Sequence, residues 1–531
     1  MTIHPNVLAR ACQRGAARAA VTAWCVALTT LCPAAGRAHT AEATLVKNIA
    51  PDADSSDPVA LTNVGGTLFF TASDGVQQIL WKSDGTPAGT VNVTALWGFA
   101  PEDPDPLFMQ AVGGTLFFSA RFSDLWRSDG TRAGTLPLLH LPADSPSGSL
   151  WELGASGGQL FFSVYHQGRV AGWEPGSGLW KSDGTAAGTQ QVKNFGCCNF
   201  PVDLIDIRGT LFFKTGPFNL TASELWKSDG TEAGTQVIRE TPGLNEPGNL
   251  TDVQGTLFFT EPSYATEPSD AEQLWRSDGT ANGTVAVAWI NDPRLLTAVR
   301  DTLFFSARDD SHGTELWKSD GTRAGTTMVS DINPGAAGSA PANLTRVGGM
   351  LFFSADDGVH GAELWKSDGS AAGTMMVSDI APGAAGSNPA FLTAVRDRLV
   401  FQACTDDGCE PWESDGSAAG TRQLADIEPG SGSSSPGPFV AAGERLFFPA
   451  YDAANGRELW ALPIDAGTAC VGDCQAASAV TISDLVEMVN IALGQASLSE
   501  CEAGDDTGDG KITVDELVTA VRNALSNCPA V

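Results

Sequence analysis

The stretch ELWKSDGTEAGT, at residues 224–235, recurs along the chain with small changes. Related stretches are ILWKSDGTPAGT at 79–90, ELWKSDGTRAGT at 315–326 and ELWKSDGSAAGT at 363–374. One tryptophan marks each copy: Trp81, Trp126, Trp180, Trp226, Trp275, Trp317, Trp365, Trp412 and Trp460. The first and last of these tryptophans are 379 residues apart over eight intervals, so the period is about 47 residues. Self-similarity at such a period predicts an architecture of stacked repeat units.

A well-formed repeat, residues 342–387, contains four short apolar segments: NLTRV, MLFFSA, ELWKS and TMMVSDI. Glycine-rich or Asp-Gly turns separate them, which predicts four β-strands. Four strands in 40–50 residues are typical of one β-propeller blade. Adjacent residues in MLFF and ELW are both apolar, so these strands should be buried on both faces, as in a sheet packed between two others. The predicted fold class is therefore all-β, a propeller of four-stranded blades.

An aromatic pair precedes the tryptophan in almost every repeat: Phe69–Phe70, Phe117–Phe118, Phe161–Phe162, Phe212–Phe213, Phe258–Phe259, Phe304–Phe305, Phe352–Phe353 and Phe447–Phe448, with Val400–Phe401 in the eighth. Residues 43–51 read as a fourth strand that lacks the first three, whereas the last repeat, ending at 463, lacks its fourth. Joining the two ends would complete one blade. We therefore expect a propeller of about nine blades over 43–463, with eight blades or two smaller rings as alternatives.

Eight of the nine repeats carry an Asp-Gly dipeptide after the tryptophan strand, with the aspartate at Asp84, Asp129, Asp183, Asp229, Asp278, Asp320, Asp368 or Asp415. Asp-Gly favours tight turns because glycine tolerates positive φ and the carboxylate accepts hydrogen bonds from the following backbone N–H groups. A metal ligand or a catalytic acid is the alternative role. Eight copies spread around a repeat array are unlike a single active site, so we predict that these aspartates are structural.

The repeated stretch resembles the ELWxxDGT repeat of exported bacterial proteins and, more distantly, the Asp-box turn of sialidase-like propellers. The resemblance covers roughly residues 43–462. It implies a propeller-like fold and an exported protein, and it carries no assigned activity.

The N-terminus has the pattern of a secretory signal peptide over residues 1–38. Three arginines precede an apolar run at 19–35, and small residues follow it, with expected cleavage near Ala38. The formal net charge of −31 becomes −35 without this segment, because it contains four arginines and no acidic residue. Such a polyanion repels nucleic acid and anionic lipid. No later stretch is apolar enough to span a membrane, so we expect a secreted or cell-surface protein.

Eight of the eleven cysteines follow the predicted signal peptide, and an even number in an exported chain predicts disulfides. Cys404 and Cys409 flank a tight loop, and Cys197 and Cys198 are adjacent. The remaining four crowd the C-terminus: Cys470, Cys474, Cys501 and Cys528. Zinc binding is the alternative, although no paired CxxC spacing and no histidine accompany this cluster.

A linker at 464–469 leads to a second module at 470–531. Its segments 480–494 and 512–526 align at an offset of 32 and predict two helices, with Leu485, Val486, Val489 and Leu493 on one face of the first. The loop before the second helix, residues 505–516, fits the twelve-residue calcium template. The expected ligands are Asp505, Thr507, Asp509, the Lys511 carbonyl and Glu516. The loop before the first helix keeps only Asp473 and Asp484 and is predicted to bind calcium poorly.

Two loop-plus-helix segments without entering helices resemble a dockerin module, over about residues 470–528. The resemblance implies a calcium-stabilised C-terminal module and a cohesin-like or cell-surface partner.

No nucleophile elbow, phosphate loop or HExxH motif is present, so no catalytic residue is predicted. Stretched loops in the third and fifth repeats hold Glu174, Glu261 and Glu267, which could act as the paired carboxylates of a glycosidase. Because a catalytic constellation is missing, we expect a binding protein that presents propeller loops to a glycan or protein partner. The alternative is a carbohydrate-active hydrolase or lyase on the same scaffold.

Overall fold

The computed structural model describes residues 43–50, 55–93, 106, 108–120, 123–141, 149–166, 176–196, 199–217, 222–242, 246–262, 271–464, 480, 482–493, 495, 501, 512, 517–518 and 520–521. The predicted signal peptide at 1–38 and the calcium loop at 505–516, apart from Ile512, lie outside these residues. The repeats belong to one compact unit, Ala41–Val531. We number the repeats 1 to 9 by their tryptophans, from Trp81 to Trp460.

β-Strands are the main secondary structure of the described part of the chain. Repeats 1 to 4 contain β2 (Val59–Val64), β3 (Thr67–Ser73), β4 (Gln78–Ser83), β5 (Val91–Asn92), β6 (Met109–Val112), β7 (Thr115–Ala120), β8 (Asp124–Ser128), β9 (Leu136–His140), β10 (Ser149–Ser156), β11 (Gln159–His166), β12 (Gly176–Ser182), β13 (Gln190–Gly196), β14 (Asn199–Ile207), β15 (Thr210–Pro217), β16 (Ala222–Ser228) and β17 (Gln236–Pro242). Repeats 5 to 9 contain β18 (Gly248–Val253), β19 (Thr256–Pro262), β20 (Ala271–Ser277), β21 (Val285–Val299), β22 (Thr302–Asp309), β23 (Gly313–Ser319), β24 (Thr327–Ser330), β25 (Ala342–Val347), β26 (Met350–Asp356), β27 (Ala362–Ser367), β28 (Met375–Ser378), β29 (Ala390–Val395), β30 (Arg398–Thr405), β31 (Gly408–Ser414), β32 (Arg422–Gln423), β33 (Val440–Ala442), β34 (Arg445–Asp452) and β35 (Gly456–Pro463). The N-terminal strand is β1 (Thr44–Lys47), and the tail contains helix α1 (Ile482–Ala492).

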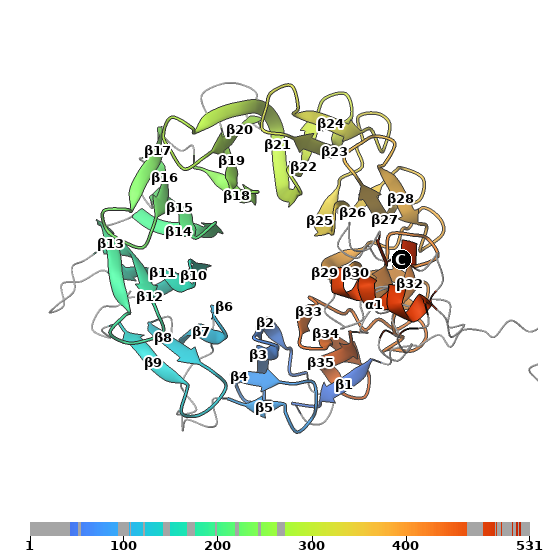
Figure 1. The fold of residues 1–531 in the computed structure, drawn as a ribbon, viewed down its shortest axis with the longest axis horizontal. Coiled ribbons are helices and arrows are strands. Elements are labelled where there is room, and N and C mark those ends of the chain that lie inside the picture. The colour runs from blue at the N-terminus through green and yellow to red at the C-terminus, as the bar shows by residue number, and fades with distance from the viewer. Residues whose placement is uncertain are drawn as a thin grey trace, which may run out of the picture. The chain divides into compact units, whose positions relative to one another are not determined.

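The strands form antiparallel sheets in chain order, such as β25-β26-β27-β28 (Figure 1). Seven sheets have four strands, and an eighth has seven because repeats 5 and 6 share the long strand β21. This sharing follows from a short connection between repeats 5 and 6, in which residues 291–294 continue the strand. The connection between repeats 6 and 7 is instead an eleven-residue loop at 331–341. The prediction of an all-β fold built of four-stranded antiparallel sheets is confirmed, except that β21 replaces two separate short strands in repeats 5 and 6.

The two ends of the repeat array pair with each other. β1 lies antiparallel to β35, with Leu45 opposite Trp460, and the sheet order is β1-β35-β34-β33. The predicted completion of the last repeat by the N-terminal strand is therefore present as a pairing of strands more than 400 residues apart.

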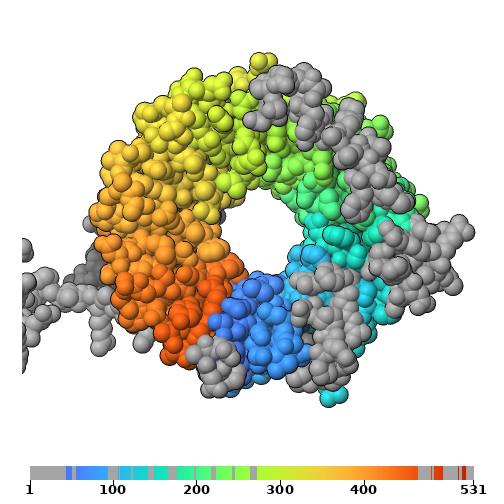
Figure 2. Space-filling model, turned by 180° about the vertical axis from the view of Figure 1, so that it is seen from behind, coloured from blue at the N-terminus to red at the C-terminus, as the bar shows by residue number. Residues whose placement is uncertain are grey.

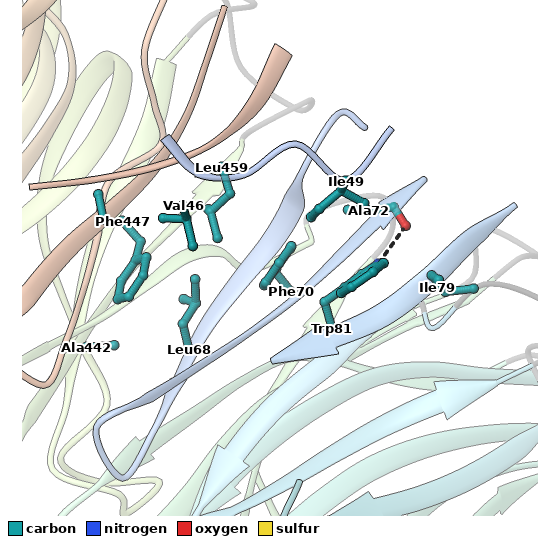
Figure 3. Close-up of a cluster of buried hydrophobic side chains, with 11 residues drawn as sticks. Val46, Ile49, Leu68, Phe70, Ala72, Ile79, Trp81, Ala442, Phe447 and Leu459 are labelled. Carbon is teal, nitrogen blue, oxygen red and sulfur yellow. Dashed lines mark hydrogen bonds between the residues drawn. The ribbon is translucent and has the colours of Figure 1, made fainter. Parts of the chain in front are cut away.

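The aromatic pairs form the core between sheets. Strands such as β26 are buried on both faces, because adjacent phenylalanines point to opposite sides. The first phenylalanine packs on the following repeat and the second on the preceding one, as Phe304 packs with Phe353. In the same way Phe447 of the last repeat and Phe70 of the first belong to one buried cluster (Figure 3). Within the described residues, nine clusters of this kind each join two repeats.

The SDGT turns are held by bonds inside each loop, as predicted for structural aspartates. Asp320 Oδ1 accepts hydrogen bonds from Thr322 N at 2.8 Å and from Thr322 Oγ1 at 2.7 Å. Thr322 Oγ1 in turn accepts from Gly325 N at 3.0 Å. A Cβ on Gly325 would lie 2.1 Å from the Asp320 carboxylate, which explains the glycine of the AGT sequence. The Thr322 hydroxyl and backbone bonds lower the pKa of Asp320 below its ordinary value.

The tail contains the predicted first helix, but the face that packs differs from the predicted stripe. Met488 is buried, and Leu485 and Ile491 pack with it against Cys501 and Ile512. Val486, Val489 and Leu493 are exposed on the other side of α1. In the second segment Val518 and Val521, which align with Val486 and Val489, are exposed as well.

One predicted disulfide is present, between Cys404 and Cys409, and it joins β30 to β31. Cys501 is also disulfide-bonded, and the other cysteines of the C-terminal cluster lie outside the described residues. Across the described ranges, no group of three or more His, Cys, Asp or Glu side chains is arranged to hold a metal ion. The same ranges contain no helix with the length and apolar character needed to cross a bilayer.

Candidate functional site

The glutamate of the ELW sequence has a structural role that the sequence analysis missed. Glu315 is fully buried and accepts hydrogen bonds from Ile332 N, Asn333 N and Ser339 N at 2.9–3.2 Å, and from Ser339 Oγ at 2.5 Å. Glu363, Glu410 and Glu458 bind their connecting loops in the same way. Burial raises the pKa of Glu315 despite these bonds. In repeats 6 to 8 the sequence shows this role by a serine that lies 24 residues after the glutamate and donates to it.

The glutamates proposed from the stretched loops do not form a carboxylate pair among the described residues. Glu174 and Glu267 lie outside those residues. Glu261 is buried, and its two oxygens accept from Arg239 Nε at 2.5 Å and Nη2 at 2.9 Å. The Arg239 guanidinium also lies over the Trp275 ring, 3.5 Å from its centre. Both carboxylate oxygens of the buried Glu261 are therefore occupied by one guanidinium group, which suits it poorly to acid–base chemistry.

A different group of side chains gathers where repeats 3, 4 and 5 meet. It consists of Trp151 and Glu152 on β10, Asp203 on β14, Lys214 on β15 and Glu246 just before β18. The strands β10, β14 and β18 are the first strands of their repeats and contact one another in sequence. They lie on the inner side of the sheets, toward the opening visible in the space-filling view (Figures 1 and 2). We call these five residues the inner-strand site.

A β-bulge presents Asp203. The pairing of β14 with β15 shifts between Val202 and Ile205, and Asp203 has a left-handed φ of 56°. A non-glycine residue in this conformation costs about 1–3 kcal/mol, so the surroundings must hold it there. The equivalent residue is also left-handed in several other repeats: Ala60, Asn249, Leu295, Asn343 and Phe391. The bulge therefore belongs to the repeat, and its side chain is free to vary.

Glu152 holds this bulge from the neighbouring repeat. Its two carboxylate oxygens accept hydrogen bonds from Asp203 N and Leu204 N, each at 2.9 Å. Burial raises the pKa of Glu152, and the nearby Asp203 carboxylate adds to that rise, whereas the two backbone bonds oppose it. Glu152 acts through Asp203 and is a positioning residue.

Lys214 links two carboxylates at the centre of the site. Its Nζ lies 2.9 Å from Asp203 Oδ2 and 3.1 Å from Glu246 Oε1, so these two oxygens are at most 6.0 Å apart. The Lys214 side chain is 14% exposed, whereas Asp203 and Glu246 are 46% and 47% exposed. Burial alone would lower the pKa of Lys214, but the hydrogen bonds and charges of Asp203 and Glu246 raise it above its ordinary value.

An exposed tryptophan borders these charges. Trp151 is 47% exposed, and its ring centre lies 6.1 Å from that of the buried Phe200, which packs in turn on Tyr165 at 4.8 Å. A large ring that is anchored on one side and open to water on the other suits a ligand with both apolar and polar groups. The site thus combines a flat apolar surface with two solvent-accessible carboxylates and one lysine.

One signal for this site is present in the sequence. Most repeats have serine or threonine directly after the aromatic pair, namely Thr71, Ser119, Ser163, Thr260, Ser306 and Ser354, where repeat 4 has Lys214. The metal ligands predicted in the tail are Asp505, Thr507, Asp509, Lys511 and Glu516, and all five lie outside the described residues, as does Asp473. Asp484 is described and is buried at the start of α1.

Comparisons with known proteins add the following. No family model and no curated protein matches this sequence. Among solved structures, a puromycin hydrolase is 13% identical with a TM-score of 0.38, covering 77% of this chain and 60% of its own. A puromycin-hydrolyzing peptidase of Mycobacterium tuberculosis is 11% identical with a TM-score of 0.39 and the same coverages. An oligogalacturonate lyase in complex with manganese is 10% identical with a TM-score of 0.36, covering 78% of this chain and 89% of its own.

This chain thus spans about 60% of the length of the peptidases. The three solved structures named above are hydrolases and a lyase, so they offer no support for the expected binding protein without catalytic activity. That expectation rested on the absence of a catalytic motif in the sequence. At this level of identity the likeness assigns neither a substrate nor a catalytic residue to this chain.

Proposed function

We propose that this chain is a carbohydrate-active hydrolase or lyase that works at the inner-strand site. The observation that carries the proposal is the pair Asp203 and Glu246, two half-exposed carboxylates held on one lysine beside an exposed tryptophan. Hydrolysis of a glycosidic bond generally uses two carboxyl groups that flank it. The Trp151 ring offers a surface for the apolar face of a sugar, while the carboxylates reach its hydroxyl groups.

The separation of the carboxylates indicates the type of reaction. Retaining glycosidases hold the two carboxyl groups about 5–5.5 Å apart, and inverting ones about 6.5–9.5 Å apart. The upper limit of 6.0 Å between Asp203 Oδ2 and Glu246 Oε1 lies below the range of inverting enzymes. If the reaction is hydrolysis, we expect the anomeric configuration to be retained. Lys214 keeps the two groups at this distance, and Glu152 keeps Asp203 at the bulge.

Activity on a polysaccharide panel tests this proposal. Asp203→Asn and Glu246→Gln should each reduce turnover by about 10²-fold or more, because each removes a carboxylate that takes part in proton transfer or nucleophilic attack. Trp151→Ala should raise KM, whereas Trp289→Ala, which removes a tryptophan 55% exposed on β21, should not. Turnover that survives both carboxylate substitutions, or that is found on no glycan of the panel, contradicts the proposal.

We propose further that the nine repeats form one closed nine-bladed propeller of the ELWxxDGT type, built as an exported protein with its signal peptide at 1–38. The buried cluster that contains both Phe447 and Phe70 and the pairing of β1 with β35 support closure. The nine inter-repeat clusters support the blade count.

For the tail we propose a dockerin-like module in which Asp505, Thr507, Asp509, Lys511 and Glu516 hold one calcium ion. Calcium would tie together a loop that carries several acidic side chains. The exposed apolar residues Val486 and Val489 of α1, and their counterparts Val518 and Val521, support a role in docking to a cohesin-like or cell-surface partner.

Calcium should raise the unfolding temperature of the tail in the full-length protein. Binding to the folded form alone stabilises by about 2.7 kcal/mol at a concentration one hundred times the Kd. Glu516→Gln should abolish the increase, because Glu516 is expected to supply two of the ligand oxygens. Asp506→Asn is the matched control, since it removes one charge from the same loop at a position without a ligand role. Calorimetry that detects no calcium uptake, or an equal loss in both variants, contradicts the site.

A further inference from the structure

The charges of the inner-strand site indicate which class of sugar it accepts. This inference rests on the proposed function. The site contains three carboxylates, those of Glu152, Asp203 and Glu246, and one ammonium group, that of Lys214. With all four groups charged, the site has a net charge of −2. We propose that it takes glycans that bear free amino groups and disfavours glycans of uronic acids.

Lys214 is poorly available to an acidic sugar. Recognition of a uronic acid requires a cation for its carboxylate, and Lys214 is the one cation in the site. Its ammonium group is already shared by Asp203 at 2.9 Å and Glu246 at 3.1 Å, and its side chain is 14% exposed. An acidic sugar would have to displace one of these carboxylates and then lie beside it. Like charges at such distances disfavour binding.

The same charges favour binding of an amino sugar. Asp203 and Glu246 are about half exposed, so a second ammonium group can approach them from solvent. Bonds between ammonium and carboxylate groups are roughly twice as strong as those between neutral groups. The exposed Trp151 ring adds a surface that attracts a cation through its π electrons. Lys214 itself demonstrates that the two carboxylates can share an ammonium group.

The charge of the whole chain acts in the same direction. A formal net charge of −31 repels polyanions and attracts polycations, and it does so most strongly at low ionic strength. This long-range electrostatic attraction acts at every acidic surface of the protein. The test must therefore separate it from recognition at the inner-strand site.

Three hexasaccharides of equal length provide the test: hexamers of glucosamine, N-acetylglucosamine and galacturonate, titrated into the full mature protein at low and at physiological salt. The glucosamine hexamer should bind at least about tenfold more tightly than the galacturonate hexamer at low salt. This gap should shrink in Asp203→Asn and in Glu246→Gln. It should persist in Asp301→Asn, which removes an exposed carboxylate outside the site.

The following results would contradict the substrate inference or the proposed function. Galacturonate binding that equals or exceeds glucosamine binding overturns the substrate inference while leaving the proposed function standing. The inference is also overturned if the preference for glucosamine over N-acetylglucosamine is unchanged in Asp203→Asn and in Glu246→Gln, because another part of the protein then recognises the amine. Failure to bind any of the three hexamers, together with turnover of another glycan, overturns this inference alone. Absence of turnover on the whole panel removes the proposed function as well.

Discussion

Replacing Glu458 by alanine should lower the free energy of unfolding of the repeat array by about 3–5 kcal/mol. Glu458 is fully buried on β35, and its oxygens accept from Ile49 N at 3.1 Å, Ala50 N at 3.1 Å and Ser56 Oγ at 2.6 Å. The substitution leaves three buried donors without acceptors, and each such donor costs about 1–3 kcal/mol. All three donors lie in the segment that joins β1 to β2. The loss should therefore loosen the contact between the two ends of the array.

The effect should also depend on pH. Burial raises the pKa of Glu458 above its ordinary value of 4.5, despite the bonds from Ser56 and the two backbone groups. A raised carboxyl pKa means that the folded state binds the proton more tightly than the unfolded state. The stability that this carboxyl contributes is therefore complete below pH 4.5 and declines as the pH rises through the folded pKa. The difference between wild type and Glu458→Ala should widen as the pH falls from neutral toward 4.5.

Glu224→Ala is the matched control, because Glu224 occupies the same position of the repeat. Its Oε2 accepts from Trp226 Nε1 at 3.1 Å and from Thr215 Oγ1 at 3.4 Å. Loss of this acceptor should cost about 1 kcal/mol, since both partners also bond to each other. Urea unfolding followed by tryptophan fluorescence compares the two variants. Equal losses would contradict the assignment of Glu458 as the residue that ties the two ends together.

The regular part of this fold follows from local sequence rules. Adjacent apolar residues such as Phe352 and Phe353 require a strand that is buried on both faces, and the Asp-Gly dipeptide fixes the turn that follows. The role of Glu458 could not be predicted in this way. Its partners Ile49 and Ser56 lie about 400 residues away, and they become neighbours only when β1 pairs with β35.

The inner-strand site was less accessible to prediction than the fold. Lys214 is visible as a departure from the serine or threonine of other repeats, but its partners come from strand β14 and from the connection that precedes β18. The exposure of Asp203 depends on a backbone bulge that no local motif encodes, since Ala60, Leu295 and Phe391 adopt the same conformation. A catalytic motif is recognisable when its residues lie in one segment of sequence, whereas this site is assembled across three repeats.

The buried face of helix α1 in the tail could not be predicted from the sequence either. Apolar residues of α1 form two adjacent stripes, one through Leu485 and Met488 and one through Val486 and Val489. Helical periodicity identifies the helix, yet either stripe could face the core. The buried contacts of Met488 with Ile512 decide the matter, and they depend on how the second half of the module folds back.

Replacing Phe70 by alanine should lower the free energy of unfolding by about 3–5 kcal/mol, the usual cost of truncating a buried phenylalanine. Phe70 is completely buried in the cluster that joins the first and last repeats, which also contains Phe447 and Leu459 (Figure 3). Its neighbour in the same cluster, Trp81, donates from Nε1 to Ala72 O at 3.3 Å, so the site has little freedom to collapse into the space left behind. The residual cavity should keep the cost near the upper part of this range.

Phe353→Ala provides the comparison that tests closure of the array. Phe353 is equally buried, but it packs between repeats 6 and 7, in the middle of the chain. In an open stack of repeats the terminal interfaces open independently, so a terminal substitution changes local opening more than global unfolding. In a closed ring no interface is terminal, and the two substitutions should shift the urea midpoint by similar amounts. Hydrogen exchange should then show global protection of β3 as strong as that of β26, because opening the Phe70 interface requires breaking the ring. Rapid local exchange of β1 and β3 in Phe70→Ala, with an unchanged global midpoint, would contradict closure.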